Sequence, residues 1–131
     1  MLEARERQEI DAAFETMARN RAEALFVMAD PMFQTQRERI VDLAAKHRLP
    51  GIFFFREFAE VGGLLSYSAN IAELRRRLAT YVDKILKGAK PGDLPIEQPT
   101  KFETVINLKT AKAIGLTVAQ SILMRADQVI D

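Results

Sequence analysis

The sequence predicts a single α/β domain with a mostly parallel sheet. Short apolar runs that suit buried strands alternate with stretches in which apolar residues recur at helical spacing. The chain has 131 residues, which is the usual length of one domain. Because strands that alternate with helices usually become parallel neighbours, we expect a three-layer α/β fold over residues 1–131.

The first helix is expected from about residue 3 to residue 20, because Ile10, Phe14 and Met17 recur at helical spacing among charged residues. A strand is expected at residues 24–28. Its unbroken apolar character suits a strand that is covered on both faces, as parallel strands usually are.

The next helix is expected to begin after Asp30, whose carboxylate is a favourable N-cap, with Pro31 in the first turn. It should run as one helix to His47 and end before Pro50. A second strand is predicted at residues 51–55, where the phenylalanines at 53, 54 and 55 are expected to be mostly core.

A short helix at residues 56–61 is expected to be broken by the glycine pair that follows, before a third strand at residues 64–67. Asn70 and Glu73 then resemble a capping box. The long helix that they start should end at Gly88. Its apolar stripe consists of Ile71, Leu74, Leu78, Tyr81, Val82 and Ile85.

Three prolines between residues 87 and 100 predict an extended connector, because proline disrupts helices. The segment at residues 102–107 is expected to be the last strand. Two short helices should follow it, one ending at Gly115 and the other beginning after Thr117.

Composition argues against several functional classes. A formal net charge of +1 gives no long-range field toward nucleic acid or acidic lipid, so neither is an expected partner. With no cysteine and one histidine, we expect no disulfide, no ordinary zinc site and no cofactor. The sequence shows no nucleophile beside a base, no set of metal ligands and no phosphate-binding loop, so no catalytic residue is assigned.

The first candidate site residue is Asp30, which stands where a buried strand passes into a helix. Its carboxylate can serve as the helix cap alone, or it can cap the helix and also face a ligand. Phe55 and Arg56 end the next strand, where Phe55 can share the same crevice. Arg56 suits a carboxylate, although a solvent-exposed pair with Glu57 or Glu60 is the more ordinary explanation for a loop arginine.

The third candidate region is the strand end at Ser66, Tyr67 and Ser68. A tyrosine favours one apolar side and one polar end, which suits a ligand or hinge role, whereas turn chemistry alone explains Ser68 and Asn70. The full candidate set for ligand binding is Asp30, Phe33, Gln34, Phe55, Arg56, Glu57, Ser66 and Tyr67.

Several sequence blocks together resemble a known family. "ADPMF", "HRLPGIF", "REFAEVGGLLSY" and "INLKTAKAIGLT" are similar to the C-terminal part of ABC transporter substrate-binding proteins of the tryptophan-binding-protein-like family. The resemblance runs from about Ala24 to Asp131. It implies one lobe of a type I periplasmic binding protein, in which two α/β lobes close on a small solute and present it to a membrane permease.

By this resemblance, Asp30 would pair with a ligand's ammonium group and Phe33 would stack on its apolar part. We expect an importer component that binds an amino-acid-like or aromatic solute without altering it. Family members act outside the cytoplasm, whereas "MLEARERQEI" has no secretory-signal pattern, so this chain alone is expected in the cytoplasm.

The expected N-terminal lobe is missing from the sequence, and this leaves an alternative open: a stand-alone cytoplasmic interaction protein. The stripe on helix 71–86 would then lack its cover. We therefore expect a homodimer through that helix, a sheet edge, or both.

Overall fold

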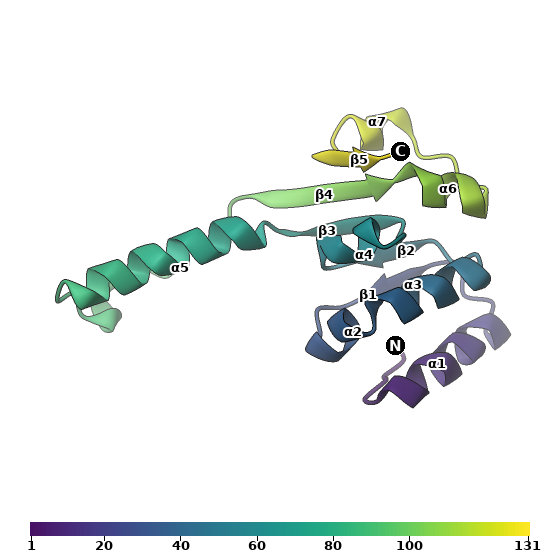
Figure 1. The fold of residues 1–131 in the computed structure, drawn as a ribbon, viewed down its shortest axis with the longest axis horizontal. Coiled ribbons are helices and arrows are strands. Elements are labelled where there is room, and N and C mark those ends of the chain that lie inside the picture. The colour runs from purple at the N-terminus through teal and green to yellow at the C-terminus, as the bar shows by residue number, and fades with distance from the viewer. The chain divides into compact units, whose positions relative to one another are not determined.

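The computed structural model describes all 131 residues, and it confirms an α/β fold built on one mostly parallel sheet. Figure 1 shows the elements in chain order. The helices are α1 (Arg7–Arg19), α2 (Pro31–Thr35), α3 (Arg37–Lys46), α4 (Arg56–Glu60), α5 (Ile71–Leu86), α6 (Leu108–Ile114) and α7 (Gln120–Leu123), with a 3-10 turn η1 (Pro91–Asp93). The strands are β1 (Leu25–Val27), β2 (Gly51–Phe53), β3 (Leu65–Ala69), β4 (Phe102–Asn107) and β5 (Gln128–Ile130).

The five strands lie in the order β1-β2-β3-β4-β5. The β1–β2, β2–β3 and β4–β5 pairs are parallel. Two hydrogen bonds give the direction of the remaining pair: Asn107 N donates to Leu64 O, and Asn70 N donates to Lys101 O. The position numbers rise on one strand as they fall on the other, so β4 runs antiparallel to β3.

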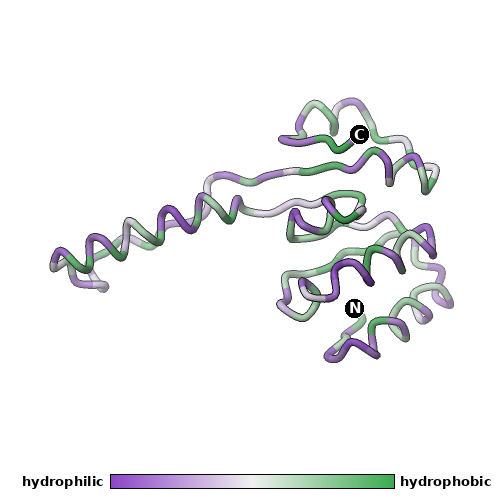
Figure 2. The backbone as a smooth tube through the Cα atoms, in the orientation of Figure 1, coloured by the Kyte–Doolittle hydropathy of each residue, from purple (hydrophilic) through white to green (hydrophobic).

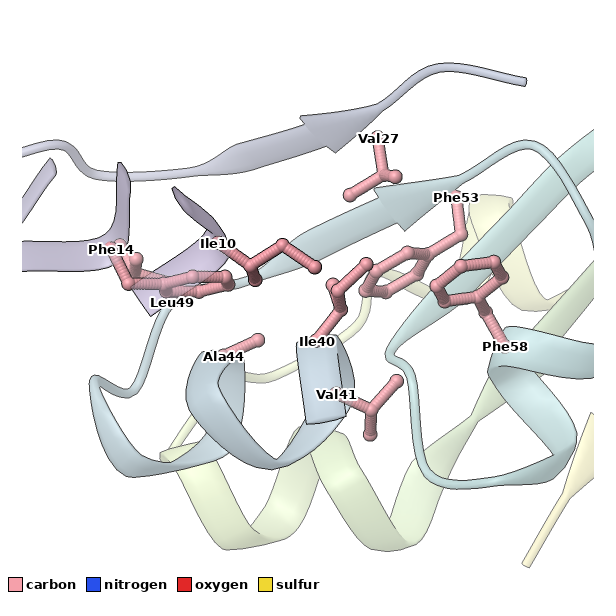
Figure 3. Packing of buried hydrophobic residues seen from close by; sticks show 9 residues of the cluster. All are labelled: Ile10, Phe14, Val27, Ile40, Val41, Ala44, Leu49, Phe53 and Phe58. Atoms are coloured by element: carbon pink, nitrogen blue, oxygen red, sulfur yellow. The ribbon is translucent and has the colours of Figure 1, made fainter. Parts of the chain in front are cut away.

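The main hydrophobic core lies on one face of β1 and β2. Figure 3 shows side chains from α1, β1, α3, β2 and α4 meeting there. Phe53 is fully buried and stacks on Phe58 with ring centroids 4.8 Å apart. The fully buried ring confirms the core assignment of Phe53, whereas Phe54 and Phe55 are only half-buried.

The opposite face of the same strands is exposed, so the expectation that residues 24–28 are covered on both faces is wrong. Phe26 is 63% exposed, and its register partner Ile52 is 43% exposed. The connections from β1 to β2 and from β2 to β3 step across the sheet in one direction. Right-handed connections of that kind put α3 and α4 on the same face, and α1 packs there too.

Two element boundaries also differ from expectation. The single helix predicted from Asp30 to His47 is interrupted at Gln36, which ends α2 and begins α3. The hydroxyl of Thr35 donates to the Met32 carbonyl, and such a side-chain bond competes with the regular helical ladder. The strand at residues 102–107 is not the last, because β5 pairs with it from Gln128 to Ile130.

The chain divides into two compact units. One contains residues 1–68 and 104–131, and the other is Ala69–Glu103, which we call the arm. Within the arm, α5 matches its predicted bounds, and Asn70 caps it by accepting a hydrogen bond from Glu73 N at 2.9 Å. Figure 2 shows hydrophobic and hydrophilic residues alternating along α5, as expected for an amphipathic helix.

Candidate functional site at the carboxyl ends of β1 to β3

The candidate site lies at one edge of the sheet, where β1, β2 and β3 end. These strands are parallel neighbours, so the residues that follow them emerge at the same edge. Asp30 follows β1, and Phe55 and Arg56 follow β2. The structure therefore brings the first two predicted regions to a common edge.

Asp30 caps α2, as the sequence predicted. Its backbone is extended, and its Oδ1 accepts a hydrogen bond from Met32 N at 2.7 Å, while Pro31 occupies the first turn. The side chain is only partly buried, and Oδ2 accepts no hydrogen bond. One carboxylate oxygen thus holds the helix start, and the other remains available to a donor.

Phe33 and Phe55 both border the core cluster from this edge. Each is half-buried and packs against it, although they come from different helix starts. The ring of Phe55 meets Phe54 edge-on, with centroids 5.1 Å apart. Next to Phe33, Gln34 has a buried Oε1 without a hydrogen-bond partner. This combination of aromatic surface and unsatisfied amide oxygen suits a ligand that carries both apolar and donor groups.

Arg56 occupies the first turn of α4 and is held in place from two sides. Its Nε donates to Glu60 Oε1 at 3.0 Å, and a terminal nitrogen donates to Gln128 Oε1 at 2.8 Å. The Glu60 bond is the simpler pairing that the sequence allowed. Glu57 lies beside it, half-buried in the same turn.

Gln128 is a site-edge residue that sequence reasoning missed. Only its place in β5 brings it to Arg56, and β5 itself was not predicted. No local pattern marks Gln128, because a three-residue exposed strand has neither a long apolar run nor an alternation to detect.

Ser66 and Tyr67 leave β3 on opposite faces. Ser66 is 1% exposed, lies in register with Phe53, and has a hydroxyl oxygen without a hydrogen-bond partner. Tyr67 is 52% exposed. β3 also extends to Ala69, so both residues lie within the strand instead of at its end. Their ligand roles stay predictions.

The arm carries a groove that the sequence did not predict. Its volume is about 500 Å³, and α5 forms one side of it while the proline-rich connector forms the other. The groove is lined by Leu74, Arg77, Leu78, Tyr81, Ile85, Pro91, Leu94, Pro95, Ile96, Glu97 and Gln98. The Tyr81 hydroxyl donates to Pro95 O, which attaches the connector to the helix.

The acidic groups and His47 form no cluster of three or more that could hold a metal ion. His47 instead stacks on Phe14, with ring centroids 5.9 Å apart. None of the helices combines the length and the apolar character that crossing a membrane requires.

In open α/β sheets, ligands bind in the crevice at the carboxyl ends of the strands, and binding pockets combine apolar surface with a few polar groups. The chain belongs to the ABC transporter substrate binding protein family, which residues 1–130 match. The family resemblance predicted from the sequence blocks is thereby confirmed. No curated protein sequence matches the chain.

Solved structures agree with this family. A Streptococcus pneumonia ABC domain in complex with L-Trp is 29% identical, with a TM-score of 0.85, and the match covers 94% of this chain and 41% of that one. A conserved domain protein from Vibrio cholerae is similar in fold, with 22% identity, a TM-score of 0.87, and 96% and 42% coverage. The chain therefore spans less than half the length of these relatives.

Proposed function

We propose that this chain forms one wall of a solute-binding cleft in the substrate-binding component of an ABC importer. The solute would be a small amino-acid-like or aromatic molecule, bound without chemical change. The observation that carries the proposal is the common edge shared by Asp30, Phe33 and Phe55. Family membership and the L-Trp complex of a relative support it.

The groups at this edge have the chemistry that such a solute needs. The open oxygen of Asp30 would pair with an ammonium group, and Arg56 would face a carboxylate. Phe33 and Phe55 would contact an apolar or aromatic side chain. We include Gln34, Glu57, Ser66 and Tyr67 as further contacts.

The opposite wall would come from polypeptide that the relatives have beyond the matched region, since the match covers 41% and 42% of their chains. Closure of the two walls around the solute would create the form that the permease recognises. We propose that the two-walled protein acts outside the cytoplasm, either in the periplasm or attached by a lipid.

A single wall should bind weakly, because pockets normally enclose 70–90% of a ligand. We expect a dissociation constant on the order of 1 mM for L-Trp with the 131-residue chain. The suitable measurement is a titration followed by amide NMR shifts. L-Trp should move the amides of Met32 to Gln34 and those of Phe55 to Glu57, while D-glucose should not.

Asp30→Asn is the matched variant for this titration. Asparagine is as good an N-cap as aspartate, so α2 should remain intact while the negative charge is lost. If Asp30 pairs with the ammonium group, the dissociation constant for L-Trp should rise at least about tenfold in this variant. That corresponds to a loss of about 1.4 kcal/mol of binding free energy. Unchanged titrations of the two proteins would contradict this role of Asp30, and no shift at these amides would contradict the site.

A further inference from the structure

A hydrogen bond joins Arg56 to Gln128, which are 72 positions apart in the chain. A terminal nitrogen of Arg56 donates to Gln128 Oε1 at 2.8 Å. Arg56 begins α4 shortly after β2, and Gln128 is the first residue of β5. Because β4 runs antiparallel to β3 and β5 runs parallel to β4, β5 begins at the edge where β1 and β2 end. The bond therefore belongs to the proposed solute edge.

This bond fixes how the Gln128 amide group is turned. A guanidinium group carries only donors, so it must meet the amide oxygen and not the amide nitrogen. With Oε1 directed at Arg56, the two N–H donors on Nε2 are turned away from the guanidinium. Gln128 is exposed, so a dissolved molecule can reach these donors.

Arg56 has donor capacity beyond this bond. Its Nε donates to Glu60 Oε1 at 3.0 Å, so the two bonds use two of the five N–H donors of a guanidinium group. The side chains of the Arg56–Glu60 pair are 40% and 46% exposed, and water weakens an ion pair of this kind. Asp127, next to Gln128, directs its carboxylate to Thr104 N at 2.8 Å. The guanidinium can therefore attract a further carboxylate.

We infer that Arg56 and Gln128 together form a carboxylate receptor at the solute edge, so the solute must carry a carboxylate group. The inference rests on the proposed function and narrows the class of solute. Gln128 has two roles in the receptor. Its Oε1 holds the guanidinium in place, and its Nε2 donates to the carboxylate that the guanidinium binds. Donors from two neighbouring groups suit the two oxygens of one carboxylate.

The neutral amide of Gln128 suits this position better than an acid would. A glutamate at position 128 would also hold Arg56, but its second oxygen would repel the carboxylate of the solute. L-Tryptophanamide has a carboxamide in place of the carboxylate of L-Trp, so it cannot form the same charge-assisted hydrogen bonds. We expect L-Trp to bind at least about tenfold more tightly than L-tryptophanamide.

The test compares these two solutes by NMR titration of the 131-residue chain, in slightly acidic buffer so that both carry an ammonium group. Gln128→Leu should lower the ratio of the two dissociation constants by at least about threefold. Gln128→Glu should reverse the preference, so that L-tryptophanamide binds more tightly. Gln120→Leu changes an exposed glutamine on α7 and should leave the ratio unchanged.

A structural role of Gln128 alone would not reverse a preference between two solutes. The backbone amide spectrum of each variant checks that the chain is folded. Equal binding of both solutes by the unmodified protein would overturn the receptor. A Gln128→Glu protein that still prefers L-Trp would also overturn it, and the bond would then serve only to tie α4 to β5.

Acetate separates the receptor from the proposed function, because it carries a carboxylate and nothing else of an amino acid. High concentrations of acetate should move the side-chain amide resonances of Gln128, whereas chloride at equal ionic strength should not. If acetate moves them and L-Trp moves no amide from Met32 to Gln34, the receptor stands and the proposed amino-acid solute is wrong. If acetate leaves them in place, the receptor is wrong even where L-Trp binds.

Discussion

Gly51 begins β2 against the ring of Phe53, and we predict that Gly51→Ala destabilises the fold by about 1–3 kcal/mol through overpacking. A Cβ at Gly51 would lie 2.6 Å from Cζ and 2.7 Å from Cε2 of that ring. The ring has little room to move, because Phe53 is fully buried and stacks nearly parallel on Phe58, at 12°.

A double-mutant cycle tests whether this clash is the cause. Phe53→Leu removes the ring atoms that a new methyl group would meet, and alone it should cost about 1–3 kcal/mol as a large-to-small core change. The double variant should then be more stable than the sum of the single effects by about 1 kcal/mol or more. Gly92→Ala is the control, because nothing lies within 4 Å of a Cβ there.

Urea unfolding at one fixed protein concentration measures the free energies of unfolding of all five proteins, the four of the cycle and the Gly92→Ala control. Fixing the concentration makes any contribution from association the same in all of them. Equal free energies of unfolding for Gly51→Ala and Gly92→Ala would show that the Phe53 ring tolerates a methyl group at position 51. Strict additivity of Gly51→Ala and Phe53→Leu would show that the cost arises elsewhere. Either result would refute the packing argument.

Two further predictions concern single polar groups. Asn107 donates from Nδ2 to the buried Ala59 carbonyl at 3.0 Å and caps α6 by accepting from Thr110 N, so Asn107→Ala should lower the free energy of unfolding by about 1–3 kcal/mol. Asn107→Asp keeps the cap and loses the donor. A melting temperature of this variant equal to that of the unmodified protein would contradict the role of the bond to Ala59 O. Desolvation first, and the nearby carboxylate of Glu97 second, raise the pKa of Tyr81 above 10.0, so its stabilising contribution is present below that pH and is lost as pH rises through the folded pKa. An absorbance titration at alkaline pH should show that Tyr81 ionises above its ordinary pKa of 10.0, and Glu97→Gln should bring that pKa back toward 10.0. An unchanged titration in Glu97→Gln would contradict the contribution of Glu97 to the pKa of Tyr81.

Much of the fold could be predicted because local signals agreed. The bounds of α5 follow from a strong cap at Asn70 and an uninterrupted helical stripe. Phe53 was correctly assigned to the core because a large aromatic residue in a short strand is costly to expose. Whether a second face is covered depends on which helices reach it, and no local pattern in residues 24–28 contains that information.

The candidate site was predictable only in part. Asp30 has a local signature, the Asp-Pro pair at a helix start, and its cap is present in the structure. Ser66 and Tyr67 were grouped because the strand was expected to end at Tyr67, but β3 continues to Ala69, and successive residues within a strand point to opposite faces. Gln128 reaches Arg56 only through tertiary pairing, and no signal near either residue connects them.

The closed base of the arm makes the pairing of β3 with β4 a contact between residues far apart in the chain. Asn70 N and Lys101 O are 3.0 Å apart, so β4 can join β3 only after the arm between them has closed as a loop. Loop-closure entropy rises slowly, by about 0.6 kcal/mol for each doubling of length, so a long arm delays this step with little thermodynamic cost. Pairing of β4 with β3 therefore tolerates a long arm between them.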